Sequence, residues 1–327
     1  MTRTLQARPH AWKLKEPFAI SRGVRDQARV LIVELHEDGK RGRGEACGVP
    51  YHGETPETML AQVEQARAAI EAGCDRQDLL AVLPAGGARH AVDAALWDLE
   101  AKLSGVPVWR RANAPRWEAV ASAVTIGIRD PDAYEGAARE RAGFPWLKVK
   151  VGRGSPLQAV TAVRRGAPQA RLIVDTNQSW TLEELRQYAP PLQALGVDLL
   201  EQPLAAGSDA GLAGYDSPIP LCADESLSTV DDLAGLVGRY QFVNIKLDKV
   251  GGLTSALELA AAARAAGFRL MVGCMLGGSV SVAPGMVLAQ QCEVCDLDGP
   301  WLQAEDWPQG IIYDAGRMLP PVPALWG

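Results

Sequence analysis

The sequence predicts an α/β protein in which a closed β/α barrel follows a smaller α+β domain. Apolar, strand-like runs recur along the chain, and each ends in a polar or charged residue. Helix-like segments, such as residues 155–165 and 181–195, lie between these runs. Counted from Lys150, the runs end at intervals of 25, 26, 23, 22, 28 and 22 residues, at Asp175, Glu201, Asp224, Lys246, Cys274 and Asp296. Strands that alternate with helices predict a parallel sheet, and this many repeats predict a barrel.

The first hundred residues lack this rhythm and predict the α+β domain. We expect three strands, over residues 5–13, 30–36 and 41–46. Asp38-Gly39 provides a hairpin turn between the second and third strands. The segment 18–26 is rich in arginine and glycine, so it is either a surface hairpin loop or a lid over the barrel mouth. Residues 52–54 form a second candidate loop of this kind.

Two helices complete this domain. The first begins at Thr55-Pro56, a capping residue followed by proline at the first helical position. The second covers residues 88–104 and ends at Gly105. A linker follows at residues 113–116, and the barrel begins with a strand over residues 120–128 that contains Thr125.

After Asp298 the barrel rhythm breaks, and a short strand-like piece covers residues 310–318. We expect this tail to return and pack on the N-terminal domain. The predicted division is therefore a capping domain over residues 1–113, a catalytic barrel over 114–301 and a tail over 302–327 that packs back on the cap.

The composition is that of a globular protein without nucleic-acid or membrane partners. Of its 327 residues, 47% are hydrophobic and 22% are charged, and the net charge is −6. Basic and acidic residues are interleaved, so no basic stripe indicates nucleic acid. No apolar run reaches the roughly 20 residues of a membrane helix, and no signal-peptide apolar region opens the chain. A homo-oligomer is compatible with the sequence.

The six cysteines are scattered, mostly within apolar segments. This distribution is typical of reduced, buried thiols in a cytoplasmic protein. Cys292 and Cys295 form a lone C-x-x-C without a second pair or a nearby histidine, so we interpret them as parts of a helix end and a strand.

Three acidic residues at successive strand ends predict a metal site. Asp175, Glu201 and Asp224 would meet at the C-terminal edge of the barrel, where such barrels place their chemistry. Hard oxygen ligands without histidine or thiolate select Mg²⁺ or Mn²⁺ over zinc. Each carboxylate alone is more often an ordinary residue at the start of a loop, but three consecutive ones flanked by lysines favour a site.

The lysines around these acids predict acid–base catalysis. Lys148 and Lys150 are two residues apart in one strand, so their side chains share a face. Lys150 lies one strand before the acidic trio and Lys246 one strand after it, so the two would face each other across the metal. A divalent cation would take the charge that develops on a substrate carboxylate as an enediolate forms, while the lysines remove and return the α-proton. The cation and Lys148 would lower the pKa of Lys150, normally about 10.4, towards neutrality, and Lys148 would stay charged and hold the substrate carboxylate.

Two opposed bases predict racemisation or epimerisation, whereas a single base suffices for elimination or cycloisomerisation. Lys246 is therefore the informative residue, although it could also be a lysine that only pairs with the carboxylates. A Schiff-base aldolase, which would need one barrel lysine but no acidic trio, and a non-catalytic binding barrel both remain open at this point.

The motif series resembles the muconate-lactonising subgroup of the enolase superfamily. The segments that carry the resemblance are Lys148-Val149-Lys150, Asp175-Thr176-Asn177, Glu201-Gln202-Pro203, residues 223–226 and residues 245–249, together with the helix over residues 91–99. The resemblance covers nearly the whole chain. It implies a modified TIM barrel of the (β/α)7β type with an N-terminal capping domain. It also implies Mg²⁺ at Asp175, Glu201 and Asp224, with Lys150 and Lys246 as the catalytic bases.

Within that subgroup, residues 295–300 are similar to the D-x-D signature of dipeptide epimerases, which bind the free ammonium of the N-terminal residue. Asp296 and Asp298 on one strand end make a good seat for a cation. Residues 20–25 and 273–276 also resemble bacterial enzymes that epimerise L-Ala-D-Glu to L-Ala-L-Glu during murein peptide degradation. This resemblance implies that Arg25 meets the glutamate carboxylate, and that Thr125 and Cys274 line the pocket.

The nearest alternatives are an N-acylamino acid racemase and an o-succinylbenzoate synthase of the same subgroup. Neither requires a cation seat, so Asp296 and Asp298 argue against both. Chemistry like that of mandelate racemase would use a histidine base, but the four histidines all lie within the first domain. One departure concerns specificity, because Gly277-Gly278 stand where many dipeptide epimerases carry an acidic or polar residue.

Overall fold

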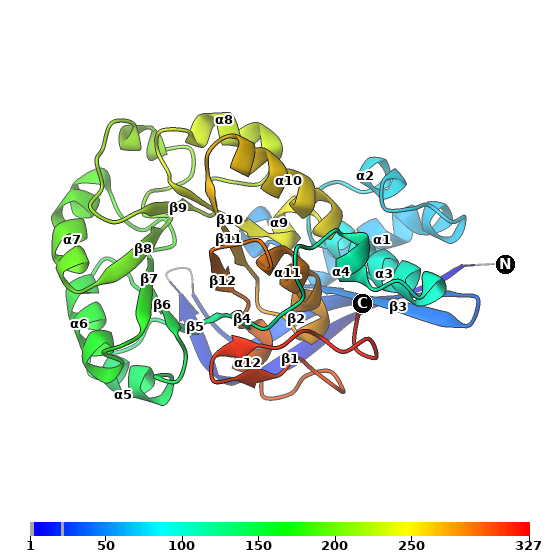
Figure 1. Ribbon diagram of the computed structural model, residues 1–327, viewed down its shortest axis with the longest axis horizontal. Helices are drawn as coiled ribbons and strands as arrows, with labels where there is room; N and C mark the ends of the chain where they lie inside the picture. Colours follow the sequence, from blue (N-terminus) through cyan, green and yellow to red (C-terminus); the bar gives the residue numbers. More distant parts are fainter. Residues whose placement is uncertain (1–2, 21–22) are drawn as a thin grey trace.

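A barrel of eight parallel strands forms the larger part of the molecule in the computed structural model, which describes residues 3–20 and 23–327. The strands follow one another around the barrel in sequence order (Figure 1). They are β5 (Ala123–Ile126), β6 (Trp146–Lys150), β7 (Arg171–Asp175), β8 (Val197–Glu201), β9 (Leu221–Ala223), β10 (Phe242–Lys246), β11 (Arg269–Gly273) and β12 (Val294–Asp296). This confirms the predicted α/β barrel, with the predicted strands shifted by at most a few residues.

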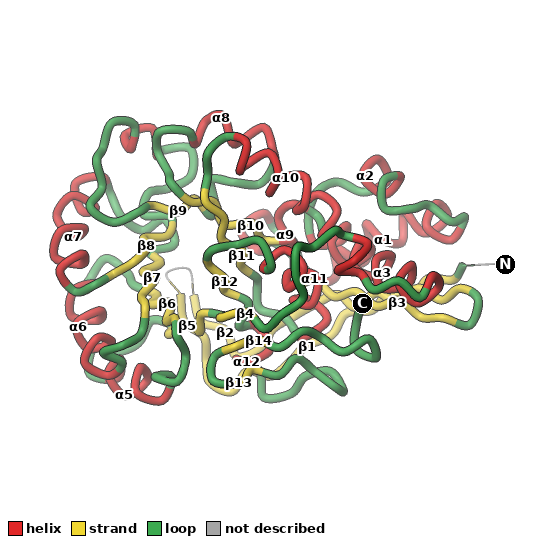
Figure 2. Tube along the Cα trace, in the orientation of Figure 1, coloured by secondary structure: helices red, strands yellow, loops and turns green. Residues whose placement is uncertain are grey.

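Helices cover the outside of the barrel (Figure 2). They are α5 (Ala133–Glu140), α6 (Pro156–Gly166), α7 (Leu182–Ala194), α8 (Leu233–Leu236), α10 (Leu253–Ala265) and α11 (Ser279–Ala289), with the short turns α9 (Leu247–Val250) and α12 (Gly299–Leu302). The interval between β8 and β9 holds only a 3-10 turn, η2 (Asp209–Leu212), and a second such turn, η3 (Val230–Asp232), precedes α8. Helices are therefore less regular around the barrel than the strand spacing suggests.

Side chains join the first and last strands of the barrel. The backbone N–H of Thr125 in β5 donates to Asp298 Oδ2 at 2.7 Å, and that of Leu297 donates to the Ser122 hydroxyl at 3.0 Å. Asp298 therefore fastens the seam between β5 and β12 at the end of the barrel where the functional residues lie.

The N-terminal domain is an antiparallel sheet covered by helices. Its strands are β1 (Thr4–Ile20), β2 (Gly23–Glu37) and β3 (Lys40–Ala46), paired in that order. The turn between β2 and β3 lies at Asp38-Gly39, as predicted, with left-handed φ angles of 50° and 72°. The sheet is covered by α1 (Pro56–Glu71), α2 (Asp78–Val82) and α3 (Gly87–Ser104), followed by α4 (Val108–Arg111).

Strands β1 and β2 are longer than the sequence suggests and extend towards the barrel mouth (Figure 1). The predicted loop over residues 18–26 is largely strand, because Phe18, Ala19 and Ile20 pair with Arg25, Val24 and Gly23. Ser21 and Arg22 lie outside the described residues. This hairpin passes over the C-terminal ends of the barrel strands and reaches the site described below.

The first predicted helix begins as expected. The Thr55 side chain accepts a hydrogen bond from the Thr58 N–H, Thr58 reciprocates, and Pro56 opens the helix. The second ends at Gly105 in the left-handed conformation. A further short turn, η1 (Pro50–His52), lies between β3 and α1 and carries Tyr51 to the barrel mouth.

The tail contacts both parts of the molecule. The strands β13 (Tyr313–Asp314) and β14 (Arg317–Met318) form a hairpin, and β14 pairs with β4 (Val120–Ala121). The predicted strand over residues 120–128 is thus two strands, since β4 leaves the barrel to join the tail. The Trp326 indole donates to the Ala94 carbonyl of α3. The exact limits of the two domains stay a prediction.

Across residues 3–20 and 23–327, no helix has the length and apolar character required to cross a lipid bilayer.

Candidate active site

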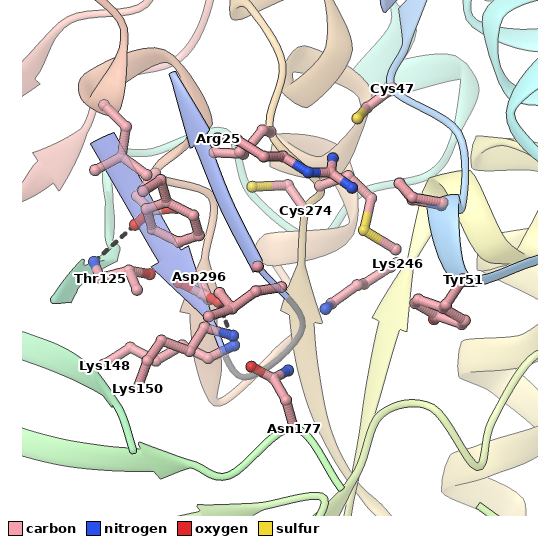
Figure 3. A pocket seen from close by; sticks show the side chains of 18 of the residues that line it. Arg25, Cys47, Tyr51, Thr125, Lys148, Lys150, Asn177, Lys246, Cys274 and Asp296 are labelled. Atoms are coloured by element: carbon pink, nitrogen blue, oxygen red, sulfur yellow. Dashed lines mark hydrogen bonds and ion pairs between the residues drawn. The ribbon is translucent and has the colours of Figure 1, made fainter. Parts of the chain in front are cut away.

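A cavity of about 340 Å³ lies at the C-terminal ends of the barrel strands. Its lining comes from the β1–β2 hairpin, the η1 turn and six of the barrel strands or the residues just after them. Figure 3 shows 18 of these side chains and labels ten of them. The lining residues are Phe18, Ile20, Gly23, Val24, Arg25, Cys47, Pro50, Tyr51, Thr125, Lys148, Lys150, Asn177, Lys246, Cys274, Met275, Leu276, Asp296, Asp298 and Leu302.

The three predicted metal ligands lie side by side beneath the lysines of this cavity. Asp175 and Glu201 end adjacent strands and are direct neighbours in the sheet register. Asp224 follows β9 by one residue, and all three side chains are buried. The parallel sheet therefore brings together three carboxylates that are separated by about 25 residues in sequence, and carboxylate oxygens are the donors that Mg²⁺ prefers.

Lysine side chains bind each of these carboxylates. Lys148 Nζ lies 3.1 Å from Asp175 and 2.8 Å from both Glu201 and Asp296. Lys150 Nζ lies 2.5 Å from Asp175, and Lys246 Nζ lies 2.7 Å from Asp224. Because these ammonium groups lie among the carboxylates, no cluster of three acidic, histidine or cysteine ligands is arranged around one point in the described chain.

The donor set nevertheless fits a divalent cation. Counting Asp296 and Asp298, five buried carboxylates meet four buried lysines, Lys148, Lys150, Lys246 and Lys249. Glu201 Oε2 is buried and accepts no hydrogen bond of ordinary geometry from the described residues, although it lies close to Lys148. Burial and the neighbouring charge of Asp175 raise the pKa of Glu201 to about 8. Buried carboxylates outnumber the buried lysines in this group by one, so a bound cation would be stabilised among them.

Lys150 and Lys246 enter the cavity from opposite sides. They belong to β6 and β10, four strands apart in the barrel order. Figure 3 shows their ammonium groups directed towards the space between them. Within the described chain, each donates one hydrogen bond, Lys150 to Asp175 and Lys246 to Asp224. An ammonium has three donors, so each keeps capacity for a further partner in the cavity.

Asp296 presents an unused oxygen at the cavity wall. Its Oδ2 accepts a hydrogen bond from Lys148 at 2.8 Å, whereas Oδ1 is buried and has no hydrogen-bond partner among the described residues. Asp298 lies nearby and accepts the N–H of Thr125. Burial and the neighbouring Asp296 raise the pKa of Asp298 to about 6. Both observations indicate a place where a ligand cation would be stabilised.

The remaining predicted substrate contacts also line the cavity. Arg25, in β2, is exposed on the hairpin above the site, and Figure 3 shows its guanidinium reaching over the cavity. Cys274 follows β11 directly, and burial raises the pKa of its thiol well above the ordinary value. Thr125 lines the opposite part of the wall. The structure thus gathers every predicted site residue around one cavity and its floor, while their roles stay predictions.

Several residues of this site were missed by sequence reasoning. Lys249 lies three residues after Lys246, and its ammonium donates to Asp224 Oδ1 at 2.7 Å and to two carbonyls. Asn244 donates to Glu201 at 3.0 Å from within β10. Both lie in the strand–turn segment that carries Lys246, and that proximity was the only signal available. Tyr51 lines the wall without any recognisable motif, whereas Met275 and Leu276 lie in the segment 273–276, whose resemblance was noted for Cys274 alone as a site residue.

Neighbouring carboxylates raise the pKa of both Lys148 and Lys246. Burial alone would lower the pKa of Lys148, but Asp296, Glu201 and Asp175 outweigh it and raise the pKa well above its usual value. Burial likewise opposes the charge of Lys246, but Asp224 raises its pKa above the ordinary value. The carboxylates therefore keep both lysines protonated unless their negative charge is offset.

Models of two protein families match this chain. The model described as "Enolase C-terminal domain-like" matches residues 133–321. The model described as "Mandelate racemase / muconate lactonizing enzyme, N-terminal domain" matches residues 2–110. Together they cover the capping domain and the barrel from α5 onwards.

Characterised relatives share about two fifths of the sequence over nearly the full length. The L-Ala-D/L-Glu epimerase of Escherichia coli (strain K12) is 42% identical over 318 residues, covering 97% of this chain and 99% of that protein. The N-acetyl-D-glutamate racemase of a Pseudoalteromonas species is also 42% identical, covering 91% of this chain and 95% of that protein.

Solved structures show the same architecture. An enolase family member from Agrobacterium tumefaciens with homology to dipeptide epimerases, solved with sodium and L-Ala-L-Glu, superposes with a TM-score of 0.97 at 42% identity over 99% of this chain and 100% of that one. The dipeptide epimerase of Cytophaga hutchinsonii, complexed with Mg and D-Ala-L-Val, superposes with a TM-score of 0.91 at 26% identity over 98% of this chain and 94% of that one.

Proposed function

This chain belongs to the mandelate racemase / muconate lactonizing enzyme family, and from that premise we propose that it is a dipeptide epimerase. Its substrate is L-Ala-D-Glu or L-Ala-L-Glu, and the reaction inverts the α-carbon of the C-terminal residue. The observation that carries this proposal is the pair of lysines, Lys150 and Lys246, on opposite walls of one cavity. The same cavity contains Asp296, whose Oδ1 has no hydrogen-bond partner among residues 3–20 and 23–327.

The two lysines act as the acid and the base. One lysine, as the neutral amine, takes the α-proton from one face of the substrate. The other, as the ammonium, returns a proton to the opposite face, so the configuration inverts. The enzyme ends with the extra proton on the lysine that was neutral at the start, and the lysine that was an ammonium ends as the neutral amine. The reverse reaction exchanges the two roles. This 1,1-proton transfer is supported by the arrangement of Lys150 and Lys246 four strands apart in the barrel.

Asp175, Glu201 and Asp224 would hold Mg²⁺, or Mn²⁺ in its place. When bound, the cation supplies positive charge that offsets these carboxylates and the charge that builds up on the substrate carboxylate as the α-proton leaves. Lys148 stays protonated and contributes a second positive charge beside the substrate carboxylate, which its raised pKa supports.

Asp296 and Asp298 form the seat for the substrate's free ammonium. An ammonium at Asp296 Oδ1 would give this buried oxygen a hydrogen bond that the described part of the chain does not provide, and would add charge-assisted binding. An N-acylated amino acid has no such cation and would leave the oxygen unpaired. This feature favours a dipeptide over the N-acetylated substrate class named for one relative.

Arg25 would bind the side-chain carboxylate of the substrate's glutamate, and Thr125 and Cys274 would complete the walls. The position of Arg25 on the hairpin above the cavity supports this role. The hairpin would also cover the cavity while the α-proton is removed, and it would thereby keep water away from the carbanionic species.

The reaction would serve the degradation of murein peptides, in which L-Ala-D-Glu is a constituent. We place it in the cytoplasm, since the six cysteines are all free and a reducing compartment keeps thiols in this state.

Isotope exchange tests the proposed function directly. The protein is incubated with Mg²⁺ in D₂O and a panel of dipeptides, and the mass and configuration of each product are measured. We expect deuterium at the α-carbon of the second residue of L-Ala-D-Glu together with inversion. Incorporation into N-acetylglutamate but into no dipeptide would replace this proposal with an N-acylamino acid racemase, and borohydride-trapped adducts would indicate a Schiff-base enzyme.

A further inference from the structure

Residues 274–278 connect the cavity to the N-terminus of α11. Cys274, Met275 and Leu276 line the cavity, and Gly278 immediately precedes the first residue of α11. Met275 and Leu276 also pack against a hydrophobic cluster beneath the capping sheet. That cluster consists of Trp12, Leu14, Ala28, Val30, Ile32 and Cys47. The wall of the cavity is therefore supported from the capping domain and not only from the barrel.

Glu45 holds this wall from the capping domain. It lies in β3, is fully buried, and accepts the backbone N–H of Gly278 on Oε1 at 2.5 Å. The same oxygen accepts the indole N–H of Trp12 at 3.1 Å. The other oxygen, Oε2, accepts the indole N–H of Trp307 in the tail at 2.5 Å. One carboxylate thus joins the capping sheet, the wall of the cavity and the tail.

The packing at Gly278 leaves little room for a side chain. A β-carbon there would lie 3.0 Å from each of Glu45 Oε2, Trp12 Nε1 and Asp306 Oδ1, so these neighbours would have to shift. The φ of Gly278 is −77°, which any residue can adopt, so space and not backbone conformation favours glycine. At Gly277 a β-carbon would lie 2.7 Å from the Ser281 hydroxyl, so close packing favours both glycines of the pair at which this sequence departs from many dipeptide epimerases.

Burial opposes the ionised form of Glu45 and raises its pKa to about 7. An apolar residue in place of Glu45 would leave the N–H groups of Trp12, Gly278 and Trp307 without this acceptor. These three donors come from three separate segments, so the geometry of Glu45 determines how those segments sit relative to one another. Asp306, which accepts the N–H of Ser279 at 2.8 Å, fixes the same helix terminus from the tail.

We propose that Glu45 is a positioning residue for substrate discrimination, which fixes Met275 and Leu276 in the cavity wall through the amide of Gly278. The inference rests on the proposed dipeptide epimerase function. Glu45 is not among the residues lining the cavity and does not touch the reacting atoms, so it acts on substrate binding through the wall and leaves proton transfer to Lys150 and Lys246.

Two variants remove different parts of this arrangement. Glu45→Gln replaces the carboxylate that accepts the Gly278 and Trp12 N–H groups with a neutral amide oxygen and presents a donor to Trp307, so the hold on Gly278 weakens and the side chain loses its orientation. Trp307→Phe removes only the indole N–H and leaves the Glu45 carboxylate intact. Asp98→Asn is the matched control, because Asp98 is also a buried carboxylate of the capping domain that accepts an N–H from the tail, that of Gly327, and none of its hydrogen-bond partners lines the cavity.

The experiment measures kcat and KM for a panel of dipeptides that differ in the second residue, together with the melting temperature and amide hydrogen exchange of residues 274–281. In Glu45→Gln and Trp307→Phe we expect KM for the preferred dipeptide to rise about three- to tenfold, while kcat changes less than about twofold and the preference among second residues narrows. Amide exchange in this segment should accelerate. Asp98→Asn should lower the melting temperature without either effect.

Unchanged KM values and unchanged exchange at residues 274–281 in both variants would overturn the inference and leave Glu45 with a purely structural role. If Glu45→Gln does not fold, Trp307→Phe carries the test alone. A wild-type protein that exchanges no dipeptide α-proton would instead refute the proposed function, so the two failures are distinguishable.

Discussion

The four buried lysines at the strand ends differ in how many of their donors are used. Lys148 contacts three carboxylates, and Lys249 donates to Asp224 and to two carbonyls. Both are therefore held in place as charges. Lys150 and Lys246 each donate one hydrogen bond within the described chain and border the cavity. Free donor capacity beside a substrate space distinguishes the two proposed bases from their neighbours.

Removal of one base should separate proton exchange from inversion. In Lys246→Ala, Lys150 can still remove and return a proton on its own face. We expect the epimerisation rate to fall by about 10²–10⁴-fold while one epimer continues to exchange its α-proton with D₂O. Lys150→Ala should leave exchange only in the other epimer. Chiral chromatography with mass spectrometry measures both, and Lys102→Ala, whose partner Asp98 lies outside the cavity, is the control.

Inversion at the wild-type rate in either variant would contradict the two-base mechanism.

Asp296 Oδ1, which has no hydrogen-bond partner in the part of the chain that the structure describes, predicts a substrate-specific effect. Asp296→Asn removes the negative charge from the proposed ammonium seat, so KM for L-Ala-L-Glu should rise about 10- to 100-fold, as expected for one charge-assisted hydrogen bond. If the enzyme also turns over N-acetyl-L-glutamate, the KM for that compound should rise less, because it carries no ammonium. Steady-state kinetics on both compounds measures the two KM values. An equal rise in both would show that Asp296 acts only through Lys148.

At the scale of elements, α9 ties the barrel to the capping domain. Asp248 in α9 accepts the N–H of Gly48 at 2.8 Å, just as Glu45 of the cap accepts an N–H of the barrel. The two carboxylates therefore form reciprocal contacts across the domain boundary. They hold the segment between β3 and η1 against the ends of β10 and β11, which carry Lys246 and Cys274.

This contact predicts a pH dependence of stability. Burial raises the pKa of Asp248 to about 7 from an ordinary 3.8, despite hydrogen bonds from Gly48 and Cys47. Between these values the folded state holds a proton that the unfolded state has lost, so the free energy of unfolding decreases as pH rises from about 4 through 7. In Asp248→Asn this contribution should be absent, so the free energy of unfolding should fall by about 2 kcal/mol less between pH 5 and pH 8 than in the wild type. Urea unfolding at pH 5 and pH 8 measures it.

The pKa of Glu45 is also raised to about 7, so Glu45 likewise makes the free energy of unfolding decrease as pH rises. Some pH dependence should therefore remain in Asp248→Asn. A variant as pH-dependent as the wild type would contradict the assignment to Asp248.

Much of the barrel and its site could be predicted, because both follow from local sequence. A charged residue that closes an apolar run marks a strand end, and parallel strands bring such ends to one edge. Asp175, Glu201 and Lys246 end their strands as expected. The capping box at Thr55 and the turn at Asp38 are local signals of the same kind.

Features that depend on distant segments could not be predicted. Glu45 and Gly278 are 233 residues apart, and no pattern in either segment marks the contact. The extension of β1 to Ile20 depends on pairing with β2 across a hairpin whose composition is that of a loop. The departure of β4 from the barrel depends on β14, nearly 200 residues later. The contacts of Lys249 were also hidden, because a lysine in a short turn is ordinarily exposed.

At the scale of the whole molecule, the tail locks the capping domain. Trp326 is almost completely buried and its indole donates to Ala94, while the Gly327 N–H donates to Asp98 at 2.7 Å. Trp326→Ala should reduce the free energy of unfolding by about 3–5 kcal/mol, the cost of a large cavity in a packed core. Val322→Ala in the same tail, at a half-exposed position, should cost less than about 0.5 kcal/mol. Chemical denaturation compares the two.

Since neither residue lines the cavity, the folded fraction of Trp326→Ala should keep the KM of the wild type. A raised KM would show that the tail influences the site more widely than through Trp307.

The carboxylate trio predicts that a divalent cation stabilises the whole fold. Asp175, Glu201 and Asp224 come from three strands and meet only in the folded barrel, so a cation that they hold binds the native state alone. At 100 times its dissociation constant, Mg²⁺ should add about 2.7 kcal/mol to the free energy of unfolding and raise the melting temperature, and EDTA should reverse the shift.

Glu201→Gln, which removes one charge, should weaken this response. Glu71→Gln, whose partners Leu5 and Arg67 lie in the capping domain, should respond as the wild type does. A melting temperature indifferent to Mg²⁺ and Mn²⁺ in the wild type would show that the lysines, and not a cation, balance these carboxylates.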